Sequence, residues 1–427
     1  MDFSPLRDYL DLPSSIPYSH YRAYLAQRRI RPRASDYEKF KSVIDAKFAI
    51  SGFRLAKVVV TRRCRFQDYN YAAGESGIFA LESDPPGDGE LPALPDVRLS
   101  LAGDWGTGTD EAVSVARGIL AFRPHFTIHL GDVYYVGDGS EIDSRCMDTP
   151  AESIPYSTAA WPRGSLGSFA LNGDRQMHAN GNGYFQKFLP ALGTGGSQGQ
   201  ISKRQAASFF CLRNEHWMLI AIDTGYNSAG YSSMLSKCKL EEALLVWLED
   251  HVRPREFGGA VIIVGHHPYF SAFDRGYDRP ATQLKKIFGD RCVLWFWAHE
   301  HRLAIYGSYK SKAGIPAFGR CVGHGGIPVH LGGPNPKTKA PLVVYDNRRY
   351  DNIDGTFVGF NGFANLTFIG NKLTVEFISL SRPLERGYSL LVRESWESKN
   401  GTPQGAGISM FESELTLVNP ELSAAQR

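Results

Sequence analysis

Short apolar runs that alternate with helix-like segments constrain the fold of this chain most. Six strand-like runs occupy residues 97–101, 126–130, 168–171, 217–222, 260–264 and 292–297. Between two pairs of these runs, apolar residues recur at helical spacing over residues 112–119 and 240–248. Alternation of this kind predicts an α/β domain in which helices flank layered sheets. The pattern alone allows either two layered sheets or one doubly wound sheet.

The chain divides by pattern into three stretches. Residues 1–95 read as an extension, with a capping box at Ser35 and Glu38, a helix, a strand at residues 55–61 and a surface loop at residues 83–89. Residues 96–330 form the expected core. Residues 331–427 are β-rich, with a hairpin turn at Gly370-Asn371, and are expected to complete the core before a tail.

Composition excludes several classes of protein. With 43% hydrophobic and 21% charged residues, the chain can bury a large core, which excludes intrinsic disorder as its main state. A net charge of +3 argues against nucleic acid or an anionic membrane as the partner. The 6 cysteines form no C-x-x-C pair, and neither a secretory signal nor a membrane span is visible. We therefore expect a cytoplasmic protein, while the oligomeric state stays open.

Polar side chains that can bind metals follow the strands of the central stretch. They lie in five blocks, Gly103–Gly106, Gly131–Tyr135, Gly173–Gln176, Gly265–Pro268 and Ala298–His301. The carboxyl ends of strands in an α/β sheet gather at one edge, so these side chains should converge. Carboxylates, a phenol and imidazoles together suit hard to borderline metal ions. Each block alone is commonly a turn, and their order along the chain carries the prediction.

In order and spacing, these blocks resemble the calcineurin-like metallophosphoesterase superfamily, and within it the purple acid phosphatases. The resemblance covers residues 97 to about 325 and rests on the family blocks GDxG, GDxxY, GNH[DE], a single His and GHxH. It implies an α/β (α+β) fold, a β-sandwich flanked by helices. It also implies hydrolysis of a small-molecule phosphate ester by a metal-bridging hydroxide.

The same resemblance implies two metal ions held by side chains at the strand ends. The first set is Asp104, Tyr135 and His301, the second is Asp174, His266 and His299, and the bridge is Asp132. One carboxylate can span two metal ions because it has two oxygens. A tyrosine phenolate favours iron at the first site, whereas iron, zinc or manganese suits the second.

The third block departs from the family. Asp174-Arg175-Gln176 stands where the family has Asn-His-Glu or Asn-His-Asp. Asp174 adds negative charge, which should weaken the Lewis acidity of the metals and repel a phosphate dianion. Arg175 cannot act as a general acid, but it could clamp a phosphate or pair with Asp174. Gln176 replaces the carboxylate that would orient the missing histidine, so the three differences read as a coupled set.

Other residues are candidates for the pocket. His178 could supply an imidazole to substrate, with a surface position as the alternative. His324, in a glycine-rich loop, could touch substrate, with a structural turn as the alternative. Trp105, Tyr134 and Tyr269 could line the pocket or pack as ordinary aromatics.

Four interpretations of function stay open. The first is a phosphate-ester hydrolase with reduced or altered activity. The second is a diiron or mixed-metal centre recruited for oxidative chemistry. The third is a metal-binding protein with little catalysis, and the fourth is a deliberately altered sequence. Phosphate release, oxygen consumption and retention of metal without either reaction distinguish the first three.

Overall fold

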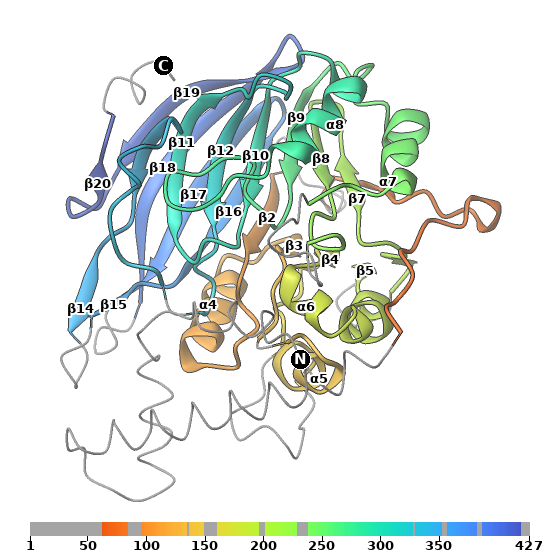
Figure 1. The fold of residues 1–427 in the computed structure, drawn as a ribbon, viewed down its shortest axis with the longest axis horizontal. Helices are drawn as coiled ribbons and strands as arrows, with labels where there is room; N and C mark the ends of the chain where they lie inside the picture. The colour runs from red at the N-terminus through yellow and green to blue at the C-terminus, as the bar shows by residue number, and fades with distance from the viewer. Residues whose placement is uncertain are drawn as a thin grey trace, which may run out of the picture.

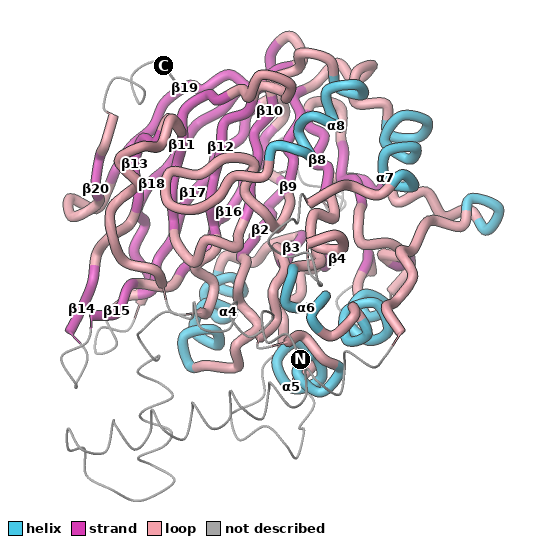
Figure 2. The backbone as a smooth tube through the Cα atoms, in the orientation of Figure 1, coloured by secondary structure: helices cyan, strands magenta, loops and turns pink. Residues whose placement is uncertain are grey.

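The computed structural model describes residues 62–83, 96–134, 136–148, 160–195, 201–228, 238–327, 329–351, 357–381 and 387–419. Within these residues, two sheets of nine strands pack face to face, with helices on their outer faces (Figure 1 and Figure 2). The β-sandwich flanked by helices is therefore confirmed, and a single doubly wound sheet is excluded. The capping box, the strand at residues 55–61 and most of the loop at residues 83–89 lie outside the described residues.

The first sheet runs in the order β19-β18-β17-β16-β2-β3-β4-β5-β6. Its strands are β2 (Val97–Ala102), β3 (Phe126–His129), β4 (Gly167–Ala170), β5 (Gly193–Thr194), β6 (Lys203–Arg204), β16 (Gly362–Ile369), β17 (Lys372–Leu380), β18 (Tyr388–Lys399) and β19 (Thr402–Met410). The strands β2, β3 and β4 are parallel, so their carboxyl ends point the same way. The predicted hairpin turn at Gly370-Asn371 joins β16 to β17, where Ile369 pairs with Lys372.

The second sheet runs in the order β1-β7-β8-β9-β10-β12-β11-β13-β20. Its strands are β1 (Ile78–Ala80), β7 (Phe210–Arg213), β8 (Trp217–Ala221), β9 (Ala260–Val264), β10 (Val293–Trp297), β11 (Leu303–Tyr309), β12 (Ala317–Val322), β13 (Leu342–Tyr345) and β20 (Thr416–Leu417). The strands β8, β9, β10 and β12 are parallel. The apolar runs of β8, β9 and β10 are buried throughout, as is typical of parallel strands covered on both faces. A separate ribbon pairs β14 (Arg349–Asp351) with β15 (Phe357–Gly359).

Helices cover the outer faces of both sheets. They are α4 (Asp110–Ala121), α5 (Gly139–Cys146), α6 (Asp174–His178), α7 (Glu242–Trp247) and α8 (Asp278–Phe288), with shorter helical turns at Tyr71–Ala73, Tyr184–Phe188, Leu189–Ala191 and Leu248–Val252. The predicted spacing over residues 112–119 corresponds to α4, which buries Val115 and Ile119 beside Phe363 of the first sheet. The spacing over residues 240–248 corresponds to α7, which packs with α8 on the second sheet. No helix in the described residues combines the length and apolar character that crossing a membrane requires.

A buried ion pair joins the two sheets through the core. Arg320 on β12 donates from Nε and Nη2 to the two carboxylate oxygens of Glu394 on β18, at 2.7 and 2.8 Å. Its Nη1 also donates to the carbonyl oxygens of Tyr306 and Gly319, both at 2.6 Å. Because both side chains are essentially fully buried, each charge depends on the other for its compensation.

Removing only one partner of this pair should be costly. We expect Arg320→Met to lower the free energy of unfolding by about 3–5 kcal/mol, because Glu394 is left buried and uncompensated. The double variant Arg320→Met/Glu394→Leu should recover most of that loss. Urea denaturation followed by circular dichroism measures both values.

The exposed pair of Arg393 and Glu376 is the matched control. The distance between Arg393 Nη2 and Glu376 Oε1 is also 2.7 Å, but the arginine side chain is 45% exposed. We expect Arg393→Met to cost less than about 1 kcal/mol. Equal losses of unfolding free energy in Arg320→Met and Arg393→Met would show that burial does not set the contribution of the Arg320–Glu394 pair to stability.

Candidate metal centre

The candidate ligands gather where strands of both sheets end. Asp104 follows β2, Asp132 follows β3, and Asp174 begins α6 just after β4. His266 follows β9 and His299 follows β10 in the second sheet. Backbone hydrogen bonds hold these ends together, with Asp104 N donating to Gly131 O at 3.0 Å and Ala298 N donating to His266 O at 3.0 Å. The predicted convergence of the blocks is thus present in the fold.

Three of these residues have a strained backbone. Asp104, Asp132 and His299 have φ values of 56°, 65° and 68°, in the left-handed region that non-glycine residues rarely adopt. Such a conformation costs roughly 1–3 kcal/mol per residue and is found mainly at functional sites. A hydrogen bond from His299 N to Asp104 Oδ2, at 2.7 Å, ties two of the strained turns together.

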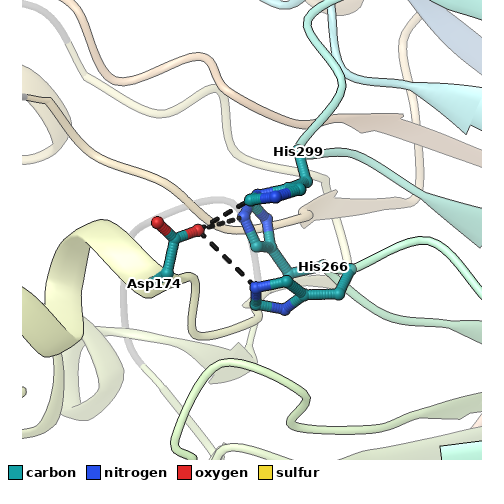
Figure 3. Close-up of side chains that lie close together, drawn as sticks. Asp174, His266 and His299 are labelled. Atoms are coloured by element: carbon teal, nitrogen blue, oxygen red, sulfur yellow. Dashed lines mark hydrogen bonds and ion pairs between the residues drawn. The ribbon is translucent and has the colours of Figure 1, made fainter. Parts of the chain in front are cut away.

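Asp174 is the centre of an imidazole cluster, to which His266, His267 and His299 contribute. Its Oδ1 lies 3.1 Å from both His266 Nε2 and His299 Nδ1 (Figure 3). It also lies 3.7 Å from His267 Nε2. Donor atoms around one tetrahedral metal ion stand about 3.3 Å apart, given metal–nitrogen and metal–oxygen bonds near 2.0–2.1 Å. The spacing of these donor atoms therefore fits a shared ion.

The tautomer of His266 supports the same interpretation. Its Nδ1 lies 2.9 Å from the carbonyl oxygen of Leu130, which can only accept, so Nδ1 carries a proton. Its Nε2 then faces two carboxylates, Asp174 at 3.1 Å and Asp132 at 3.4 Å. Burial disfavours the charged ring, but Asp132 and Asp174 raise the pKa of His266 well above its usual value. The ring needs either a second proton or a metal ion at Nε2.

A second cluster adjoins the first and contains a phenol. Tyr134 places its hydroxyl oxygen 2.7 Å from Asp104 Oδ1, 3.3 Å from Asp132 Oδ2 and 2.9 Å from His301 Nε2. Burial, then Asp104 and Asp132, raise the pKa of Tyr134 well above its usual value. Burial also raises the pKa of Asp104 to about 7 and lowers that of His301 well below its usual value. The cluster thus lacks positive charge of its own.

Charge balance indicates that cations belong here. Asp104, Asp132 and Asp174 bring three carboxylates into a site that is almost closed to solvent. Burying an uncompensated carboxylate is expensive, so such groups are paired or coordinate metals. His301 Nδ1 is also buried without a hydrogen-bond partner among the described residues. These residues fit metal ions by their donor chemistry and by their spacing.

The altered block is built into the centre. Arg175 N donates to Asp132 Oδ1 at 3.0 Å, and Arg175 Nε lies 3.8 Å from Asp132 Oδ2. Gln176 Oε1 accepts from Asp132 N at 3.2 Å and from Gly173 N at 3.1 Å. Only glycine fits at position 173, because a Cβ there would lie 2.1 Å from Asp132 Oδ1. The block therefore supports Asp132 as well as supplying Asp174.

The remaining predicted residues take different positions. His178 Nε2 lies 3.8 Å from Asp174 Oδ2, and its side chain is only 11% exposed, so it lies beside the cluster rather than on the open surface. His324 is fully buried, and its carbonyl oxygen accepts from Gly362 N at 2.8 Å. A Cβ at Gly362 would lie 2.7 Å from His324 Nε2, so the ring packs against β16. Tyr135 lies outside the described residues.

Of the three predicted pocket aromatics, the structure brings only Tyr134 to the two clusters. Trp105 is buried and donates from Nε1 to Ala112 O at 2.7 Å. Tyr269 is buried too, with its hydroxyl 3.2 Å from Ile315 O. Both therefore pack as ordinary core aromatics, which was the alternative interpretation.

Sequence reasoning missed two contributors to the centre. Tyr134 was considered only as a pocket aromatic, although its hydroxyl touches three candidate ligand groups. His267 was not considered at all, although it follows His266 directly and joins the imidazole cluster. Its Nδ1 lies 3.1 Å from Thr224 Oγ1, which also accepts from the backbone N of both histidines at 3.2 and 3.0 Å. Because His266 and His267 are adjacent residues of the same type, the sequence does not indicate that both reach the centre.

Comparison with known proteins finds matches among solved structures alone. No protein-family model and no curated protein sequence matches the chain. Among solved structures, it is similar to GAP50, the anchor in the inner membrane complex of Plasmodium, with 17% identity, a TM-score of 0.43, and coverage of 72% of this chain and 90% of that one. It is also similar to PhoD, with 9% identity, a TM-score of 0.44, and coverage of 76% and 74%.

A third similar structure is the purple acid phosphatase PPD1 from yellow lupin (Lupinus luteus) seeds. The identity is 12%, the TM-score 0.42, and the coverage 66% of this chain and 51% of that one. Within the described residues, the fold is a sandwich of two nine-stranded sheets flanked by helices. At these identities and TM-scores the likeness carries no argument about this chain, so activity must be inferred from the side chains.

If the clusters bind metal, metal should stabilise the folded chain. We expect Zn(II), added to chelator-treated protein, to raise the free energy of unfolding by about 2.7 kcal/mol at one hundred times its Kd. Thermal unfolding with and without metal measures the change. His266→Ala, which removes the imidazole that lies against both Asp174 and Asp132, should show a much smaller increase. An equal increase in the free energy of unfolding of wild type and variant would show that the metal binds outside these clusters.

Proposed function

We propose that this chain is a binuclear metal-dependent hydrolase of phosphate esters. One observation carries the proposal, the position of Asp132 between the two clusters. Its Oδ1 lies 3.4 Å from His266 Nε2, and its Oδ2 lies 3.3 Å from the hydroxyl of Tyr134. A carboxylate whose oxygens face different ligand groups is suited to bridge two metal ions.

The surrounding side chains support one ligand set on each side of Asp132. The first set is Asp104, His301 and a tyrosine phenol, and the second set is Asp174, His266 and His299. When bound, two metal ions supply a hydroxide nucleophile and attract the phosphoryl oxygens. A phenol donor favours iron in the first set, and the imidazole-rich second set suits iron, zinc or manganese.

Arg175 has a charge-balancing role in this proposal. Its guanidinium lies near Asp132 Oδ2, at 3.8 Å from Nε, and 5.5 Å from the centre of the Tyr134 ring. It stays protonated and therefore offsets the extra carboxylate of Asp174. It can bind a phosphoryl oxygen by charge, but it cannot give a proton to the leaving group.

Substrate contacts follow from the same geometry. His178, beside Asp174, is a candidate to contact a small-molecule phosphate ester or its leaving group. The full burial of His324 favours its structural role over contact with substrate. Location in the cytoplasm and the absence of nucleic-acid and membrane partners stay predictions from the sequence.

The bridging role gives a direct test of this function. Metal-loaded wild-type protein should release phosphate from an aryl phosphate ester and bind two metal ions. Asp132→Ala should lose activity and lower the metal content at both sites, because both ions lose a ligand. Metal analysis and a phosphate assay on the same samples give both readings. Unchanged stoichiometry in Asp132→Ala would contradict the binuclear centre, and wild type that retains metal without releasing phosphate would favour a metal-binding role alone.

Restoring the altered block should raise activity toward alkyl esters. Asp174→Asn/Arg175→His removes one negative charge and returns an imidazole that can protonate the leaving group. Loss of one acid–base contribution typically costs roughly 10²–10⁴-fold, so recovery up to that range is expected for alkyl phosphates. Activated aryl esters should gain less, because their leaving groups need no proton. If the double variant does not hydrolyse alkyl esters faster, then Arg175 in place of the family histidine has not lowered the rate of catalysis.

A further inference from the structure

We propose that a cleft beside the imidazole cluster binds a second anionic group of the substrate, either a carboxylate or a phosphate. The inference deepens the proposed function and rests on it, because it names the substrates as phosphate esters whose leaving group is itself negatively charged. The cleft, called the α8 cleft below, has a volume of about 360 Å³. It is lined by the end of the loop before α8 and by the start of that helix, at Arg275, Gly276, Tyr277, Asp278, Arg279 and Thr282.

Tyr277 joins the α8 cleft to the imidazole cluster. Its side chain lines the cleft. The centre of its ring lies 5.0 Å from the centre of the His267 ring and 6.1 Å from that of the His299 ring, in edge contacts. The cleft and the imidazole cluster therefore share one aromatic wall, so a single small substrate can reach both.

The backbone holds this wall in place. Tyr277 N donates to Pro268 O at 2.9 Å, which closes the loop that begins directly after His267. A Cβ at Gly276 would lie 2.9 Å from the Cα of Phe270, so the close fold of this loop depends on glycine. The α8 cleft therefore has a fixed position relative to the histidines at the carboxyl end of β9.

The charges of the α8 cleft favour an anion. Two arginines outnumber the one aspartate among the residues that line it. Within the part of the chain that the structure describes, no carboxylate pairs with the Arg279 guanidinium. The Arg275 guanidinium carbon lies 5.2 Å from the centre of the Tyr277 ring. The helix α8 also begins here, and its N-cap residue Tyr277 makes no side-chain hydrogen bond to the first turn. Arginine beside the open N–H groups of a helix N-terminus suits a carboxylate or a phosphate.

A charged leaving group would offset a weakness of the proposed metal centre. The carboxylates of Asp104, Asp132 and Asp174 reduce the attraction of that centre for a phosphate dianion. Binding energy from a part of the substrate that lies away from the reacting bond can offset such a cost. We therefore assign Arg275 and Arg279 to substrate specificity, whereas the reaction itself stays with the metal centre.

Phosphonates are suitable probes, because their carbon–phosphorus bond resists hydrolysis and binding is measured apart from turnover. Calorimetric titration of Zn(II)-loaded protein compares phenylphosphonate with 4-carboxyphenylphosphonate and the longer 4-(2-carboxyethyl)phenylphosphonate. We expect wild type to bind at least one carboxylated probe about 10-fold more tightly than phenylphosphonate, the usual gain from a charge-assisted hydrogen bond. Arg275→Gln/Arg279→Gln should bind all three probes with equal affinity.

Lys285→Gln/Lys286→Gln is the matched control, because it removes two positive charges from the last turn of the same helix. It should keep the preference of wild type. The inference is wrong if the lysine variant loses the preference equally, since net charge and not the α8 cleft would then cause it. It is also wrong if the arginine variant keeps the preference, or if wild type binds all three probes equally. These results leave the hydrolase intact, whereas metal-loaded wild type that binds no phosphonate would contradict the proposed function as well.

Discussion

The compensation of buried carboxylates is the constraint on which this structure depends. Asp104, Asp132 and Asp174 meet where the two sheets converge, in surroundings almost closed to solvent. Arg175 supplies one positive charge near Asp132, and Asp132 and Asp174 raise the pKa of His266, so protons or metal ions at the imidazoles must supply the rest of the compensation. A centre of this kind is stable when cations complete it, which ties folding, metal binding and chemistry to the same residues.

The fold serves this centre by making strained turns tolerable. Asp104, Asp132 and His299 adopt left-handed backbone conformations where parallel strands end. Each is held by neighbours, through a hydrogen bond from His299 N to Asp104 and one from Asp132 N to Gln176. The buried ion pair of Arg320 and Glu394 connects one sheet to the other. The ligands therefore stand on rigid strand ends.

The altered block acquires a physical meaning from this arrangement. Asp174 Oδ1 lies 3.1 Å from the imidazoles of both His266 and His299, so the added carboxylate is integrated in the imidazole cluster. Arg175 and Gln176 both contact Asp132, one through its backbone and guanidinium and the other through its amide oxygen. All three residues therefore contact residues of the candidate metal centre.

The sequence by itself determined the strands, the hairpin at Gly370-Asn371 and the blocks that carry the ligands. Those features are local, because apolar runs and Gly-Asp turns follow from residues close together in the chain. The sequence could not choose between two layered sheets and one, nor bring the Tyr134 hydroxyl to Asp104 and His301. It also could not place His267 in the centre or His324 in the core. These outcomes depend on contacts between residues distant in the chain, such as the bridge from Gly106 to Val133, and only tertiary packing creates such contacts.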